Sequence, residues 1–143
     1  MKEVAKYTNC FVCGDKNPIG LKAKFWYDQN QVTTSLEATE RFEGYRGIYH
    51  GGIIATMLVE VMIKAVLALD IFAVTAEISI RFKRPVQIGT RLEFVGRITQ
   101  HKGRVFVTAG EVSDSDGNLY ATANAKYIKA NGELQQSLEA SLE

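Results

Sequence analysis

The segment YHGGIIATMLVE, residues 49–60, places a histidine and two glycines at the start of a long apolar stretch. After Gly52 the chain contains neither glycine nor proline until about Leu69, and an uninterrupted segment of this length is typical of a helix rather than a strand. Apolar residues occupy nearly every direction around that helix. The sequence therefore predicts one long helix that other parts of the chain cover on most sides.

The polar residues of this helix fall on a single narrow stripe. Thr56, Glu60 and Lys64 are spaced four residues apart, so they lie on one side of the helix. Glu60 precedes Lys64, which is the order that favours an ion pair between them. We expect this pair at the surface or against a partner subunit, with strands alone covering the other sides.

The segments on both sides of the helix alternate apolar and polar residues, as strands with one buried face do. Before the helix, LKAKFWYD (21–28) and VTTSLEA (32–38) flank a polar turn and predict a hairpin. After the helix, four strand-like segments joined by short turn sequences predict an antiparallel meander. These four segments are residues 73–86, 90–100, 104–114 and 119–130.

Composition excludes several classes of protein. A net charge of +1 supplies no broad field that would attract nucleic acid. Charged residues interrupt the apolar stretch 53–76 too early for it to span a membrane, and the N-terminal residues contain no apolar signal core. We therefore expect a cytoplasmic protein with neither nucleic acid nor a membrane among its partners.

The 143 residues are expected to form one domain, residues 1–143. Within it, residues 1–19 form an N-terminal turn segment and residues 131–143 form a C-terminal tail. Leucines spaced four residues apart in this tail predict either a short amphipathic helix or a frayed end.

Cys10 and Cys13 stand in the motif CFVCG of the N-terminal segment. A pair with this spacing suits a packed turn, half of a metal site or a redox pair. The sequence contains no second cysteine pair, and His50 is remote along the chain. The packed turn is therefore favoured, and a metal site shared across a dimer and a redox pair remain as alternatives.

Three motifs, in this order, resemble those of the hot-dog acyl-CoA thioesterases related to the phenylacetate-pathway thioesterase. They are CFVCGDKNPIGL (10–21), HGG (50–52) and VTAEISIRFKRPVQIGTRLEFVGRI (74–98), and the resemblance covers about residues 7–129. It implies an α+β hot-dog fold, in which a curved antiparallel sheet of about five to six strands wraps one long central helix. It also implies hydrolysis of an acyl-CoA to a carboxylic acid and coenzyme A, with no metal or other cofactor, by a homodimer that pairs again into a tetramer.

Thioester hydrolysis requires donors for the carbonyl oxygen and a carboxylate for the water. Backbone N–H groups at a helix N-terminus are unpaired and lie at the positive end of the helix dipole. Gly51 and Gly52 are therefore candidates for polarising the carbonyl, although they would equally serve a sharp turn into the helix. His50 either touches the thioester and organises the site, or hydrogen-bonds to the backbone and fixes the start of the helix.

In the family the catalytic carboxylate lies nine residues after the histidine, where this sequence has Val59. Glu60 follows one position later, which is about 100° further around a helix. We expect Glu60 to be the base or the nucleophile, with the ion pair to Lys64 as its structural alternative. The replacement at Val59 also supports a second hypothesis, a non-catalytic protein that binds acyl-CoA as a sensor or carrier.

The resemblance assigns further roles in the strand after the helix. Thr75 stands ten residues before Pro85, where similar thioesterases carry a hydroxyl that holds the attacking water, although threonine is also common in strands. Arg81, Lys83 and Arg84 are expected to bind the phosphates of coenzyme A, or else to be ordinary solvent-facing residues. The alternate apolar residues of this strand are expected to face the helix: Ile78, Ile80 and Phe82.

Overall fold

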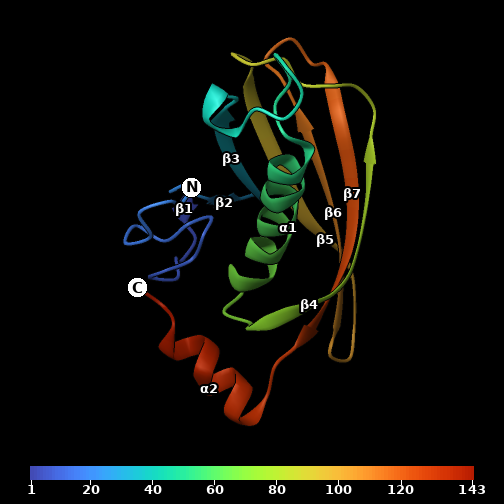
Figure 1. The fold of residues 1–143 in the computed structure, drawn as a ribbon. Helices are drawn as coiled ribbons and strands as arrows, with labels where there is room; N and C mark the ends of the chain where they lie inside the picture. The colour runs from blue at the N-terminus through green and yellow to red at the C-terminus, as the bar shows by residue number, and fades with distance from the viewer.

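The computed structural model describes residues 1–143. One long helix, α1 (Gly51–Leu67), lies against the concave face of a seven-stranded antiparallel sheet (Figure 1). A 3-10 turn, η1 (Glu40–Phe42), precedes α1, and a short helix, α2 (Gly132–Ala140), follows the last strand. The strands are β1 (Lys2–Glu3), β2 (Trp26–Asp28), β3 (Gln31–Glu37), β4 (Ala73–Phe82), β5 (Arg91–Lys102), β6 (Val105–Ser113) and β7 (Leu119–Lys129).

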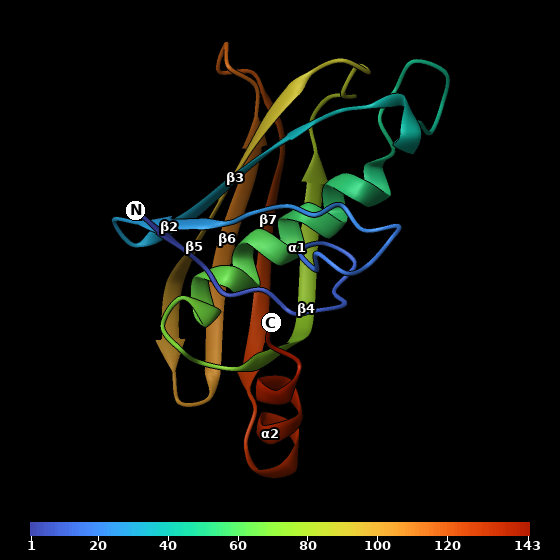
Figure 2. The same ribbon diagram turned by 90° about the vertical axis from the view of Figure 1, so that its left-hand side faces the viewer.

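The strands are ordered β1-β2-β3-β5-β6-β7-β4 across the sheet. β5, β6 and β7 form a meander as predicted, but β4 pairs with β7 at the far edge and not with β5. The prediction of a four-strand meander is wrong here because β3 occupies the place beside β5, with Val32 opposite Gly96. Between β3 and β4 the chain crosses from one side of the sheet to the other, and α1 lies within this connection (Figure 2).

The first hairpin forms, but its first strand is shorter than predicted. β2 and β3 pair around Gln29 and Asn30, whose positive φ angles of 49° and 66° suit a two-residue hairpin turn. Residues 21–25 leave the strand conformation because Lys22 adopts a φ of 53°. These residues bond instead to the cysteine segment, where the carbonyl of Val12 accepts a hydrogen bond of 2.9 Å from the N–H of Ala23.

The N-terminal segment covers the side of α1 that faces away from the sheet (Figure 2). Val12, Cys13 and Phe25 are buried in the same core cluster as the inward residues of α1. The expectation that only strands cover the helix is therefore incomplete, because a segment of irregular structure covers one side.

Strand β4 leaves part of its apolar face uncovered. Ile80 packs against the core, as predicted, but Ile78 and Phe82 remain 37% and 52% exposed. All three lie on the inward face, as predicted, since they pair with the buried Ala125, Ala123 and Ala121 of β7. Ile78 and Phe82 stay partly exposed because β4 is an edge strand that the helix covers only in part.

One central helix within a curved antiparallel sheet is the predicted hot-dog fold, with seven strands in place of five to six. The helix begins and ends within two residues of its predicted bounds. None of the helices is both long and apolar enough to cross a membrane.

Candidate functional site

His50 ends the loop before α1 and caps the helix. Its Nδ1 accepts a hydrogen bond of 2.8 Å from the N–H of Gly52. A Cβ at Gly52 would lie 2.9 Å from the His50 ring, so the absence of a side chain at this position allows the cap to form. The contact corresponds to the structural role considered for His50, which fixes the start of the helix, and its part in catalysis stays a prediction.

Gly51 is the free backbone donor at this end of the helix. Its N–H makes no hydrogen bond within the protein, whereas the N–H of Ile53 bonds to the His50 carbonyl at 3.1 Å. An unpaired N–H in the first turn lies at the positive end of the helix dipole. Of the two glycines predicted to polarise a carbonyl, Gly51 is therefore the one whose N–H is available.

A cavity of about 880 Å³, called here the first cavity, opens beside this helix start. Residues of the loop before α1 and residues at and just after the end of β4 form its wall. Lys83 and Arg84 therefore line the same cavity as His50 and Gly51. The two cations lie where the phosphates of a bound ligand could reach them. Arg81, the third predicted phosphate contact, lies within β4 opposite Thr122 and does not line the cavity.

Tyr49 also lines the first cavity, a position that no motif in the sequence predicts. Its hydroxyl is buried and makes no hydrogen bond. Burial raises the pKa of Tyr49 to about 12, so the hydroxyl stays protonated at neutral pH. Buried hydroxyls without a partner are rare and call for an explanation, such as a ligand group that binds there. The only signal in the sequence was its position next to HGG.

Glu60 lies away from the helix start, about 13 Å further along α1. Its carboxylate is 3.7 Å from Lys64 Nζ, and the Lys64 side chain is fully buried. The Lys64 ammonium also donates to the carbonyl of Ala5 at 2.5 Å and to the Sγ of Cys13 at 3.3 Å. The predicted ion pair is confirmed, but its predicted place at the surface is wrong, because the N-terminal segment covers this side of the helix.

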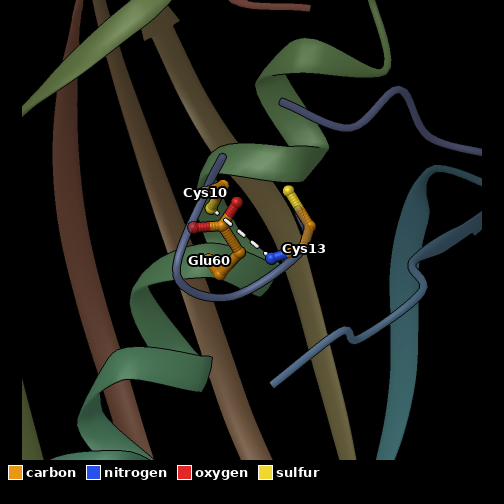
Figure 3. Close-up of side chains that lie close together, drawn as sticks. All are labelled: Cys10, Cys13 and Glu60. Carbon is orange, nitrogen blue, oxygen red and sulfur yellow. Dashed lines mark hydrogen bonds between the residues drawn. The ribbon is translucent and has the colours of Figure 1, made fainter. Parts of the chain in front are cut away.

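Cys10 and Cys13 face Glu60 from the N-terminal segment (Figure 3). The two sulfurs and a carboxylate oxygen all lie within 4.8 Å of one another. A second cavity, of about 660 Å³, is lined by Cys10, Glu60, Tyr7 and Leu138 among others. The cysteines lie in a packed turn, as favoured, and the sequence gave no sign that this turn meets Glu60.

The pKa values of the three groups in this cluster are shifted in different directions. Burial and, to a smaller extent, the charge of Cys10 raise the pKa of Glu60 to about 7, and Lys64 opposes the shift. The hydrogen bond between the two thiols lowers the pKa of Cys10 and, with burial, raises that of Cys13. Glu60 is therefore poised to take up a proton near neutral pH, and Cys10 is the more readily ionised thiol.

Thr75 and Val59 complete the predicted positions. Thr75 lies near the beginning of β4, roughly 23 Å along the strand from Phe82 at its other end. It lines neither cavity. Val59 carries no polar side chain, and its carbonyl accepts a hydrogen bond of 2.9 Å from the Tyr127 hydroxyl. A single chain thus brings His50 and Gly51 together with two cations, but it does not bring Glu60 or Thr75 to them.

The chain is similar in sequence to a curated relative, acyl-coenzyme A thioesterase THEM4 of Xenopus laevis. The two are 25% identical over 118 residues, which are 80% of this chain and 53% of the relative. The chain therefore spans about half the length of the curated relative that it matches.

Two solved structures have a similar fold. A phenylacetic acid degradation-related protein from Ralstonia eutropha JMP134 superposes with a TM-score of 0.68 and 27% identity, over 76% of this chain and 85% of that one. A protein from Streptococcus mutans UA159, solved with acetyl CoA bound, gives a TM-score of 0.70 and 21% identity, over 75% of this chain and 89% of that one.

The family model of the thioesterase superfamily matches residues 46–121, which are just over half of the 143 residues. The matched range contains the HGG helix start, all of α1 and the cations at the end of β4. Because the match includes these features and most of the sheet, the chain belongs to the thioesterase superfamily.

Proposed function

We propose that this protein is an acyl-CoA thioesterase, which hydrolyses a thioester to a free carboxylic acid and coenzyme A. The observation that carries the proposal is the unpaired N–H of Gly51 in a cavity that also holds Lys83 and Arg84. The name of the Xenopus laevis relative and the acetyl CoA bound by the Streptococcus mutans protein support the same substrate class.

The helix start polarises the thioester. The carbonyl oxygen accepts a hydrogen bond from the Gly51 N–H, which stabilises the negative charge that develops on this oxygen. His50 acts through the backbone, because its bond to Gly52 holds the first turn in place. Lys83 and Arg84 bind the phosphates of coenzyme A through their positive charges.

A homodimer completes the site in this proposal. β4 is a free sheet edge, and Ile78 and Phe82 lie partly exposed on one face of it. Antiparallel pairing of two such edges sets the beginning of one β4 beside the end of the other. Glu60 and Thr75 of the partner subunit would then approach the helix start, from which they are distant within one chain.

Hydrolysis then follows with water as the nucleophile. Thr75 of the partner subunit holds the water, and Glu60 of the partner subunit takes one of its protons. The water oxygen bonds to the carbonyl carbon, and the carbon–sulfur bond breaks. The thiolate of coenzyme A leaves and takes up the proton.

A matched pair of variants at Gly51 tests the central step. Gly51→Pro removes the N–H, and proline is well tolerated at the first position of a helix. Gly51→Ala keeps the N–H and places its Cβ in ordinary contact with the Phe82 ring, 3.6 Å away. We expect thiol release from a panel of acyl-CoAs to fall about 100-fold in Gly51→Pro and little in Gly51→Ala. A wild-type protein that releases no thiol from any substrate would overturn the proposal.

Val59 favours one second candidate, a protein that binds acyl-CoA without cleaving it. Its signature is measurable binding of acyl-CoA with turnover near background. Val59→Asp restores the family carboxylate and discriminates between the two functions. A large gain of hydrolysis supports the binding protein, whereas a small change together with loss of activity in Glu60→Gln supports the thioesterase.

A further inference from the structure

The cluster of Cys10, Cys13 and Glu60 has no role in the proposed binding of coenzyme A. It joins two elements far apart in the sequence, the N-terminal turn and the middle of α1 (Figure 3). Its three potential ligand atoms lie within 4.8 Å of one another, close enough for one ion to contact all three. Two sulfurs and one carboxylate oxygen form a donor set that suits zinc.

The turn that carries the cysteines is organised around the sulfur of Cys10. This sulfur accepts hydrogen bonds from the N–H groups of Val12 at 3.3 Å and Cys13 at 3.4 Å. The N–H of Gly14 closes the turn onto the Cys10 carbonyl at 2.9 Å. A Cβ at Gly14 would lie 2.4 Å from the Cys10 nitrogen, so only glycine fits there. N–H groups directed at a sulfur stabilise the thiolate, which is the form that binds metal.

The charges of the cluster balance with a divalent cation. Two thiolates and one carboxylate carry three negative charges, and Lys64 supplies one positive charge to them. Lys64 is fully buried and donates to the Sγ of Cys13 and to the Ala5 carbonyl, so its charge lies directly beside the cluster. A divalent ion would neutralise the two remaining negative charges, and Lys64 would hydrogen-bond to the ligating sulfur.

We propose that Cys10, Cys13 and Glu60 bind one zinc ion, with the fourth coordination position open to the second cavity. Cys10 and Glu60 line this cavity, whereas Cys13 is buried behind them. Three protein ligands and one accessible position distinguish such a site from a closed structural zinc site. The fourth ligand is water, and binding releases the protons of the two thiols to solvent.

Zinc binding is compatible with the proposed thioesterase activity but does not depend on it. A carboxylate that binds the ion through one oxygen keeps its second oxygen free to accept a hydrogen bond from water. Zinc content and thiol release are separate measurements, so either proposal can fail alone.

The test measures metal content and coordination. The full chain is reduced, stripped with a chelator, dialysed against zinc and assayed by atomic emission, and Co²⁺ is added as a spectroscopic probe. We expect one zinc per chain and the intense near-ultraviolet bands of a cobalt–thiolate complex. Cys13→Ser is expected to weaken zinc binding by about 100-fold or more and to diminish these bands.

Glu60→Gln tests the carboxylate ligand, and Glu43→Gln, a carboxylate outside the cluster, is the matched control. We expect Glu60→Gln to weaken zinc binding and Glu43→Gln to leave it unchanged, with circular dichroism confirming that each variant is folded. The proposal is overturned if the reduced wild type binds no zinc, or if Cys13→Ser binds it as tightly as the wild type.

Discussion

Lys64 shows most clearly what a single residue contributes to this protein. Its ammonium is fully buried, pairs with Glu60, and lies 5.3 Å and 5.7 Å from the ring centroids of Tyr7 and Phe25. The spacing of Glu60 and Lys64 was enough to predict the pair. Its burial could not be predicted, because helical periodicity identifies a face but not the distant segment that covers it.

Removing Lys64 leaves a buried carboxylate without its cation. We expect Lys64→Met to lower the free energy of unfolding of the metal-free protein by about 3–5 kcal/mol. The double variant Lys64→Met/Glu60→Gln removes both charges and should recover a large part of this loss. Urea denaturation at neutral pH measures both values, and equal losses in the two variants would contradict the account.

The secondary-structure elements were predicted from the sequence with unequal accuracy. The helix was predicted to within two residues because its apolar pattern and flanking glycines are local signals. The partner of β4 was wrong because strand pairing is decided across the whole sheet, and turn sequences indicate only where strands end. Alternation predicts a strand over residues 21–25, but the positive φ of Lys22 and the hydrogen bonds to the cysteine turn exclude one.

The N-terminal cap of α1 gives a prediction for stability. A Cβ at Gly52 would displace the His50 ring, whereas one at Gly51 meets only an ordinary contact. Both variants gain the helix propensity of alanine, so this gain cancels in the comparison. We expect Gly52→Ala to be less stable than Gly51→Ala by about 1–2 kcal/mol in denaturant unfolding. Equal stabilities would mean that the His50 cap contributes nothing.

The turn between β6 and β7 gives a prediction for acid stability. Asp114 accepts hydrogen bonds from the side chain of Asn118 at 2.9 Å and from the Tyr120 hydroxyl at 2.8 Å. These bonds and those from two backbone N–H groups lower its pKa from 3.8 to about 2. A lowered carboxyl pKa stabilises the fold above pH 3.8, and this stabilisation is lost as the pH falls toward 2.

Thermal unfolding between pH 4 and pH 2 is therefore expected to show a smaller decrease in Tm for Asp114→Asn than for the wild type. Asp116→Asn is the control, because the Asp116 side chain accepts no hydrogen bond. Asp116 contributes only its backbone N–H, which donates to Asp114. If the Tm of Asp114→Asn falls with pH as steeply as that of the wild type, other carboxyls determine the loss of stability in acid.

At the scale of the whole molecule, one chain holds two incomplete halves of a candidate site. The helix start and two cations lie at one cavity, and Glu60 lies at the other. The motifs predict that these residues belong to one site, and their membership stays a prediction. Spacing along the chain alone does not show which of them lie at the same cavity, because that depends on how the strands are ordered in the sheet.

The exposed face of β4 gives the prediction for assembly. Ile78→Lys places a charge in the proposed interface, and we expect it to weaken the dimer by about 100-fold, since burying an unpaired charge costs several kcal/mol. Thiol release should fall in parallel. Ile19→Lys is the control, because Ile19 is 67% exposed and lies outside β4. Analytical ultracentrifugation measures the outcome, and a wild type that sediments as a monomer would contradict the dimer.

Residues 6–8 and 141–143 lie together beside the second cavity. The N–H of Thr8 bonds to the Ser141 carbonyl at 3.0 Å, and Tyr7 forms a bridge with Leu142. Leu138, Ala140 and Ser141 form part of the wall of this cavity, which Cys10 and Glu60 also line. A change in the packing of the C-terminal segment would therefore alter how far solvent reaches Cys10 and Glu60.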